Sequence, residues 1–196
     1  LYVDTNSAMS GGVTISGVSA TFVGALGNAG LIQDGVNVNA GALAGGVYNT
    51  GTIGSGSVAG IYLASNASLL AGLTNSGSIG GAVTGIKLAQ SSLSGGLNNT
   101  GIVEGSTYAL YVDTNSAMSG GVTISGVTAT FVGALGNAGL IQDGVNVNAG
   151  ALAGGVYNTG TIGSGSVAGI YLASNASLLS GLTNSGSIGG AVTGIK

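Results

Sequence analysis

The 196-residue chain contains no cysteine, proline, histidine or tryptophan, and lysine supplies its two cationic side chains. Without cysteine there is neither a disulfide framework nor a thiolate metal site. A net charge of −3 leaves no basic surface for phosphate groups, which excludes nucleic acid as a partner. No stretch of about eighteen residues avoids Gly, Ser, Thr and Asn, so the sequence predicts no membrane-spanning segment.

The residues that are present favour packed β structure. Charged residues make up 4% of the chain, against about a quarter in ordinary domains, and 42 residues are glycine. Low charge and abundant glycine are typical of disorder, but 44% of the residues are apolar, with Val, Ile and Thr throughout. The sequence starts at Leu1 in the middle of a pattern, so we expect it to be a piece of a longer protein.

A long tandem repeat organises the chain. Residues 1–87 and 110–196 match at an offset of 109 and differ only at Ser19/Thr128 and Ala71/Ser180. We therefore expect two units, residues 1–109 and a truncated second copy at residues 110–196, within one continuous solenoid.

A shorter template recurs inside each unit: an aliphatic residue, a small pair, an aliphatic residue and then Asn-x-Gly-x-aliphatic. Its copies are spaced by 34, 26, 24 and 25 residues and begin at Met9, Leu43, Leu69, Leu93 and Met118. Because Asn and Gly tolerate left-handed backbone angles and stacked Asn side chains can hydrogen-bond, the pattern predicts a structural turn ladder. Its residues are Asn49, Gly51, Asn75, Gly77, Asn99, Gly101, Asn158, Gly160, Asn184 and Gly186.

Two irregularities occur once per unit. Ile15 and Ile124 replace the Asn of the template, and we expect them to interrupt the ladder. About ten extra residues, around a shortened echo of the template at Asn28–Ile32, lengthen the 34-residue spacing. They form either a loop or part of a fifth, tighter rung.

The spacing predicts an all-β, single-stranded parallel β-solenoid with four to five rungs per 109-residue unit. Each rung of 24–26 residues offers about three short strands separated by Gly, Asn and Ser. A propeller blade needs about 40 residues. A helical solenoid would lose about 1 kcal/mol for every glycine in a helix.

Runs such as LTNSGSIGG, GIKL and LSGGLNNTGIVEG resemble the repeat regions of large bacterial surface proteins, the autotransporter passengers and filamentous adhesins. The resemblance implies a right-handed β-helix, an extracellular or bacterial cell-surface location, and a role in adhesion, aggregation or a surface filament. We expect a structural protein, an adhesin shaft or filament, rather than an enzyme. Its expected partners are copies of itself, lateral or head-to-tail, and other cell surfaces or glycans.

Two alternatives remain beside the structural role. A polysaccharide-active enzyme needs paired carboxylates, whereas the acidic residues are isolated: Asp4, Asp34, Glu104, Asp113 and Asp143. The GGxGxD runs of calcium-binding β-rolls do not occur, so we predict no catalytic, cofactor or metal site. Ice binding is the stronger alternative, because small polar residues form one column: Ser16, Thr50, Ser76 and Thr100.

An outward-facing column is a candidate surface for lateral association. It is predicted to contain Asn37, Tyr62, Lys87, Tyr111, Asn146, Tyr171 and Lys196. Exposed tyrosine provides contact area at low entropic cost. The candidate contact residues are Tyr62, Lys87, Tyr111 and Tyr171; the alternative is ordinary stacking of surface side chains between rungs.

Overall fold

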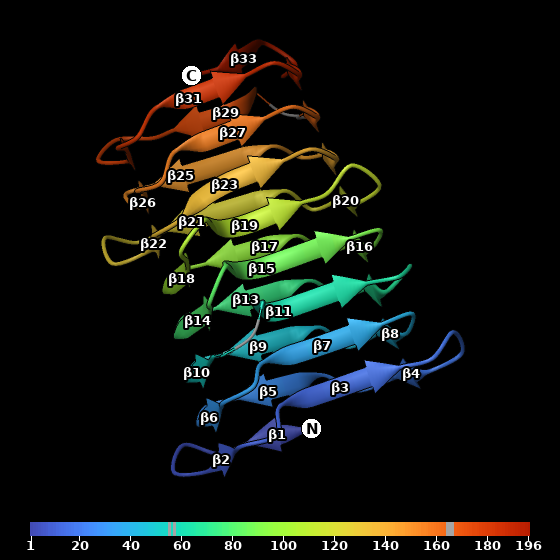
Figure 1. The fold of residues 1–196 in the computed structure, drawn as a ribbon. Helices are drawn as coiled ribbons and strands as arrows, with labels where there is room; N and C mark the ends of the chain where they lie inside the picture. The colour runs from blue at the N-terminus through green and yellow to red at the C-terminus, as the bar shows by residue number, and fades with distance from the viewer. Residues whose placement is uncertain (55, 57, 164–166) are drawn as a thin grey trace.

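The computed structural model describes residues 1–54, 56, 58–163 and 167–196, which coil into a parallel β-solenoid (Figure 1). Four strands make one rung, and each strand pairs in parallel with the strands one turn before and after it. The strands therefore form four sheets along the axis, with the two chain termini at opposite ends. The described residues contain no helix, and the predicted all-β solenoid is confirmed.

Sheets 1 and 3 contain the longer strands. Sheet 1 consists of β1 (Tyr2–Val3), β5 (Leu26–Asn28), β9 (Val47–Asn49), β13 (Leu73–Asn75), β17 (Leu97–Asn99), β21 (Val122–Ser125), β25 (Val145–Asn148), β29 (Ala168–Leu172) and β33 (Thr193–Ile195). Sheet 3 consists of β3 (Val13–Ser16), β7 (Val36–Asn39), β11 (Ala59–Ala64), β15 (Thr84–Ala89), β19 (Tyr108–Val112), β23 (Ala134–Asn137), β27 (Val156–Asn158) and β31 (Leu182–Asn184).

Sheets 2 and 4 lie between them and are built mostly from two-residue strands. Sheet 2 consists of β2 (Ala8–Met9), β6 (Leu31–Ile32), β10 (Thr52–Ile53), β14 (Ser78–Gly81), β18 (Ile102–Gly105), β22 (Thr130–Phe131), β26 (Ala151–Leu152) and β30 (Ser177–Leu178). Sheet 4 consists of β4 (Thr21–Phe22), β8 (Ala42–Leu43), β12 (Ser68–Leu69), β16 (Ser92–Leu93), β20 (Ala117–Met118), β24 (Leu140–Ile141), β28 (Thr161–Ile162) and β32 (Ser187–Ile188).

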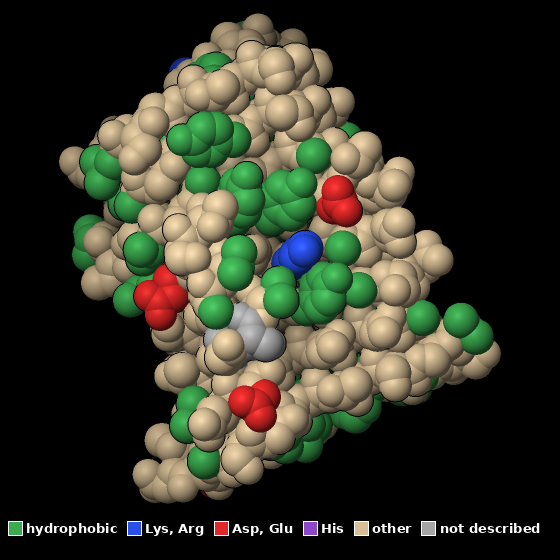
Figure 2. Space-filling view, in the orientation of Figure 1, with side chains coloured by type: hydrophobic (Ala, Val, Ile, Leu, Met, Phe, Trp, Pro, Cys, Tyr) green, Lys and Arg blue, Asp and Glu red, His purple; other side chains and the backbone are tan. Residues whose placement is uncertain are grey.

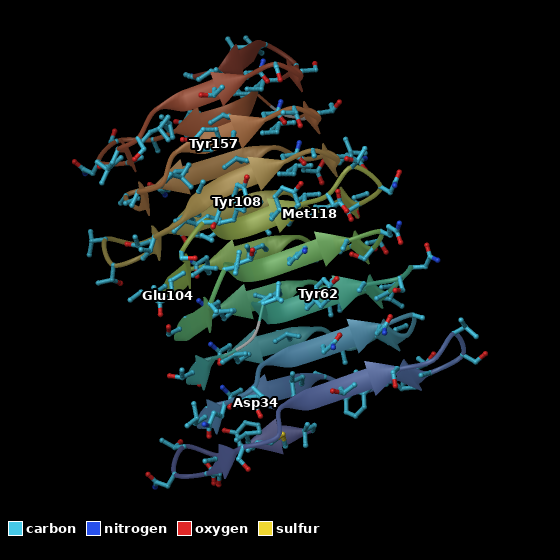
Figure 3. All side chains as sticks on the ribbon, in the orientation of Figure 1. Asp34, Tyr62, Glu104, Tyr108, Met118 and Tyr157 are labelled. Atoms are coloured by element: carbon cyan, nitrogen blue, oxygen red, sulfur yellow. The ribbon has the colours of Figure 1, made fainter. Side chains whose placement is uncertain are left out.

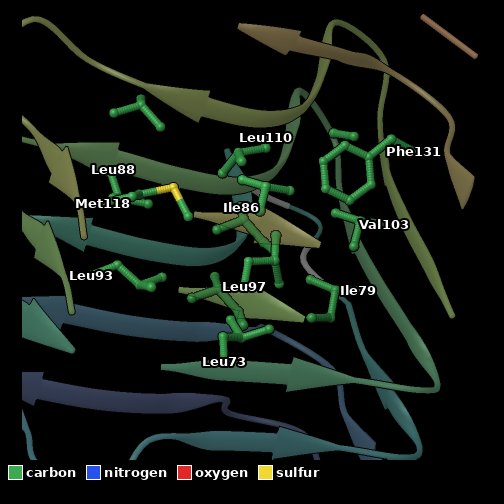
Figure 4. Close-up of a cluster of buried hydrophobic side chains, with 14 of the residues drawn as sticks. Leu73, Ile79, Ile86, Leu88, Leu93, Leu97, Val103, Leu110, Met118 and Phe131 are labelled. Carbon is green, nitrogen blue, oxygen red and sulfur yellow. The ribbon is translucent and has the colours of Figure 1, made fainter. Parts of the chain in front are cut away.

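A single hydrophobic core, mostly aliphatic, runs through the coil (Figure 4). Strand residues alternate between inward and outward positions, so Val36 and Val38 are buried while Asn37 between them is exposed. The register places like residues on like in successive rungs, as in the pairs Ile61↔Ile86 and Leu63↔Leu88. Each rung therefore covers the apolar layer of the next, and no rung has a core of its own.

One 109-residue unit spans four and a half rungs. Tyr2 in β1 and its equivalent Tyr111 in β19 are eighteen strands apart, and four strands make a rung. We call two consecutive strands, from sheets 1 and 2 or from sheets 3 and 4, a half-turn. A unit contains nine half-turns, an odd number, so equivalent residues of the two units lie on opposite sides of the coil.

The irregular 34-residue spacing is one and a half turns. Val13 lies in sheet 3 and its template counterpart Val47 in sheet 1, so the extra residues near Asn28 supply one additional half-turn rather than a loop. The prediction for Ile15 is wrong for the same reason: Ile15 pairs with Val38 on sheet 3, away from the asparagines.

Candidate functional site

Stacked asparagine side chains form two hydrogen-bonded ladders, buried inside the coil except at Asn184 in the last rung, which is exposed. In the first, Asn28, Asn49 and Asn75 each donate from Nδ2 to Oδ1 of the asparagine one rung further on, at 2.7 Å, and Asn99 is the last acceptor. The second ladder joins Asn137, Asn158 and Asn184 with the same 2.7 Å spacing. The first ladder lies on sheet 1 and the second on sheet 3, which follows from the odd number of half-turns.

Each ladder amide also holds the corner that follows it. Nδ2 of Asn49 lies 3.1 Å from the carbonyl oxygen of Gly51 and 3.0 Å from that of Ser78 in the next rung. Its side chain is 1% exposed. The Gly51 carbonyl also accepts a backbone hydrogen bond from Ser78, at 2.9 Å, so the buried amide adds a second donor at the corner and is itself satisfied there.

The glycines of the ladder have a different role from the predicted one. The left-handed glycines of the chain do not include Gly51, Gly77, Gly101, Gly160 or Gly186. A Cβ atom on Gly77 would instead overlap the carbonyl oxygen of Gly51 one rung below, and the other four meet the previous rung in the same way. Close stacking of successive corners, not backbone angle, therefore requires glycine here.

The ladders end against aliphatic residues. Ile124 pairs with Asn99 and ends the first ladder, as predicted. At the starting end, Val3 pairs with Asn28 and Val112 with Asn137. Oδ1 of Asn28 and Oδ1 of Asn137 are buried without a hydrogen-bond partner.

Two ladder members were missing from the sequence prediction. Asn28 and Asn137 start the ladders, and the shortened echo of the template at Asn28–Ile32 was the available signal. The rung from Asn28 to Asn49 contains 21 residues, against 26 in the rung from Asn49 to Asn75.

The predicted outward column is two columns on opposite sides of the solenoid. Tyr62, Lys87 and Tyr111 face outward in register on sheet 3. Tyr171 pairs with Asn146 on sheet 1, and Lys196 lies beside Tyr171 in the next rung of the same sheet. The four candidate contact residues therefore do not share one face.

Side chains of each column stack between rungs. The Nζ of Lys87 lies 5.4 Å from the ring centroid of Tyr62, and that of Lys196 lies 5.8 Å from the ring centroid of Tyr171. Both distances are within the range of cation–π attraction. Figure 2 shows a lysine on the sheet 3 face surrounded by hydrophobic side chains.

A tyrosine pair lies beyond this lysine. The ring centroids of Tyr108 and Tyr111 are 4.8 Å apart, and both rings border Gly136 of the next rung, where no side chain keeps them away. Desolvation by burial raises the pKa of Tyr111, and the nearby charge of Asp113 and the Tyr108 hydroxyl raise it further. Tyr108 and Tyr157 lie along the same face in Figure 3.

The small polar column is occupied by internal hydrogen bonds. The hydroxyl groups of Thr50, Ser76 and Thr100 lie 3.3–3.5 Å from carbonyl oxygens of the rung below, to which they donate. Ser16 lies on sheet 3, away from these corners. The column on which the ice-binding alternative depends is therefore shorter than expected.

Among the described residues, the carboxylate groups lie far apart on the solenoid, as their isolation in the sequence predicts. Oδ1 of Asp4 and Oδ1 of Asp113 each accept a hydrogen bond from the next backbone amide, at 2.7 Å. Glu104 lies on sheet 2, well separated from Asp34 in Figure 3. Within the described part of the chain, no three His, Cys, Asp or Glu side chains come together as a metal site would need.

Comparison with known proteins leaves the fold as the main guide to function. No protein-family model, no curated protein and no solved structure matches this chain. In the described residues, no helix is long and apolar enough to cross a membrane.

Proposed function

We propose that the chain is a structural segment of a long, repetitive extracellular or bacterial cell-surface protein. It acts as a stiff shaft or filament in attachment, aggregation or matrix formation, without catalysis, cofactor or metal. Self-association, lateral or head-to-tail, and contact with other cell surfaces belong to the same proposal.

The observation that supports the proposal is the junction between the two units. The strands before and after residue 109 pair in register on sheet 4, with Ser92↔Ala117 and Leu93↔Met118 across the boundary. Leu97↔Val122 continues sheet 1 in the same way. Because the core runs through the boundary without a break, further units can extend the same rod.

The outward-facing columns on sheets 1 and 3 are the surfaces through which lateral association would occur. Equivalent units present Tyr62 and Tyr171 on opposite sides, so a rod with several units carries like surfaces on two faces. A rod with contact surfaces on both faces can have a neighbour on each side, which suits a bundle or sheet of filaments.

Electron microscopy of chains with two, four and eight units tests the shaft function. At about 4.8 Å per rung, each added unit should lengthen a thin rod by about 22 Å without widening it. Compact particles, or a length that does not increase with the number of units, would contradict the proposal.

A further inference from the structure

Two equivalent surface grooves, one per unit, have no role in the proposed shaft function. The first runs across the starting ends of β3, β7 and β11 and is bordered by Thr14, Asp34, Asn37, Val58 and Tyr62. The second runs across β21, β25 and β29 and has the equivalent side chains, with Lys196 in addition. Their volumes are about 390 and 350 Å³, within the usual range of small-molecule sites.

Glycines before the strands hollow out each groove. Gly12 and Gly35 have φ angles of +67° and +78°, which favour glycine, and neither carries a side chain that would fill the space. The first groove includes the end strand β3 of its sheet, whereas the second has further strands of its sheet, β17 and β33, on both sides. The hollow therefore does not depend on its neighbours along the axis.

The side chains around the groove combine an aromatic ring with hydrogen-bonding groups. Along sheet 3 the outward positions are Thr14, Asn37, Tyr62 and Lys87 in successive rungs. Lys87 lies over one face of the Tyr62 ring, and the groove lies on the other side of Tyr62, over Asn37 and Thr14. Asp34 is exposed at the opposite end (Figure 3).

The chemistry of these groups selects a class of ligand. A peptide strand cannot add to the backbone at the groove, because β7 is already paired with β3 and β11 on its two sides. An anionic ligand would meet Asp34, which is the charged side chain that borders the first groove. The carboxylate accepts hydrogen bonds, and the amide and the hydroxyl group both accept and donate them, so together they can bind several hydroxyl groups at once.

We propose that each groove binds a neutral saccharide. A pyranose ring presents C–H groups on its face, which pack on the Tyr62 ring and Val58, while its hydroxyl groups hydrogen-bond to Asp34, Asn37 and Thr14. The groove extends over three rungs, so it accommodates a short oligosaccharide rather than one sugar. In a multi-unit array the sites alternate between the two faces, and their repetition raises the avidity for a polymeric glycan.

Calorimetric titration of the 196-residue chain with maltotetraose, cellotetraose, mannotetraose and chitotetraose tests this site. At least one of the four should bind with a stoichiometry of two per chain. The double variant Tyr62→Ala, Tyr171→Ala should bind at least about tenfold more weakly, because the ring surface is lost. Tyr62→Ala alone should reduce the stoichiometry to one.

Two other exposed tyrosines provide the matched control. Tyr48 and Tyr157 occupy outward positions on the same two sheets but do not border either groove, so Tyr48→Ala with Tyr157→Ala should leave binding unchanged. Circular dichroism checks that both double variants keep the fold. No binding of any of the four probes overturns the proposal, as does equal loss in the control; rod lengths measured on the same samples test the shaft function separately.

Discussion

The two sides of each rung make their corners in different ways. On the side of the asparagine ladder, the corner after Asn49 is held by a buried amide and by a glycine that stacks closely on the corner below. On the opposite side, where the inward residue is aliphatic, the corner uses left-handed backbone angles at non-glycine residues. These residues are Ala40, Ser65, Asn66, Gln90, Ala149 and Asn175.

The two kinds of corner exchange sides between the units. Ala40, Ser65 and Gln90 follow strands of sheet 3 in the first unit, whereas Ala149 and Asn175 follow strands of sheet 1 in the second. Because nine half-turns separate equivalent positions, the ladder ends on sheet 1 at Asn99 and resumes on sheet 3 at Asn137. Except in the first rung, each complete rung therefore has one ladder asparagine and one aliphatic residue at the facing position.

The ladder corner thus depends on contacts between rungs, while the left-handed corner depends on local backbone angle. Substitutions at the ladder corner should therefore be the more destabilising, because they disturb at least two rungs.

The largest effect is expected from Gly77→Ala. The added Cβ overlaps the carbonyl oxygen of Gly51, so successive corners must move apart, and we expect a loss of at least about 3 kcal/mol in the free energy of unfolding. Chemical denaturation measures the loss. Gly11→Ala is the matched control, because its Cβ meets no atom within 4 Å, and it should change stability by less than about 0.5 kcal/mol. Equal effects of the two substitutions would contradict the requirement for close stacking at the ladder corner.

A smaller loss is expected from Asn75→Leu in the middle of the ladder. The substitution leaves Nδ2 of Asn49 and Oδ1 of Asn99 without their 2.7 Å partners, and we expect a loss of about 2–3 kcal/mol. Asn99→Leu at the ladder end removes one of these ladder bonds rather than two, so its cost in the same denaturation experiment should be clearly lower. A greater loss at Asn99 would show that the ladder is not the stabilising element.

The smallest expected effect is the difference in stability between two substitutions that each introduce an asparagine. Val112→Asn places an amide below Asn137, whose Oδ1 is buried and unpaired, and so extends the ladder by one rung. Val147→Asn places an amide between Ile124 and Leu172, where no ladder partner exists. Val112→Asn should therefore be less destabilising by about 1–2 kcal/mol in thermal or chemical unfolding. The opposite order would contradict the assignment of the ladder ends.

Much of this architecture was predictable from repetition. The alternation of Val36, Asn37 and Val38 predicted which side chains are buried, and the Asn-x-Gly spacing predicted the stacked asparagines. The role of Gly51 was not predictable, because both a left-handed angle and a close approach require glycine, and the sequence does not distinguish them. Asn28 was missed because its template copy is shortened at the extra half-turn.

The position of Tyr171 shows where a linear pattern is insufficient. Its sequence neighbourhood is the same as that of Tyr62, and a one-dimensional repeat gives both residues the same role. Their placement on opposite faces depends on the number of half-turns between them, which is known only once each strand has a partner.

By itself, the sequence determined the β-solenoid, its repeat and the alternation of inward and outward residues, because strand period and stacking of like residues are written in every copy. The tertiary structure alone decided on which side of the coil each copy lies. Both kinds of half-turn present a short apolar strand followed by a bend, so the sequence does not give the number of half-turns between two copies. The hydrogen-bond register between rungs fixes that number, and it assigns the ladders, the corners and the two grooves to their faces.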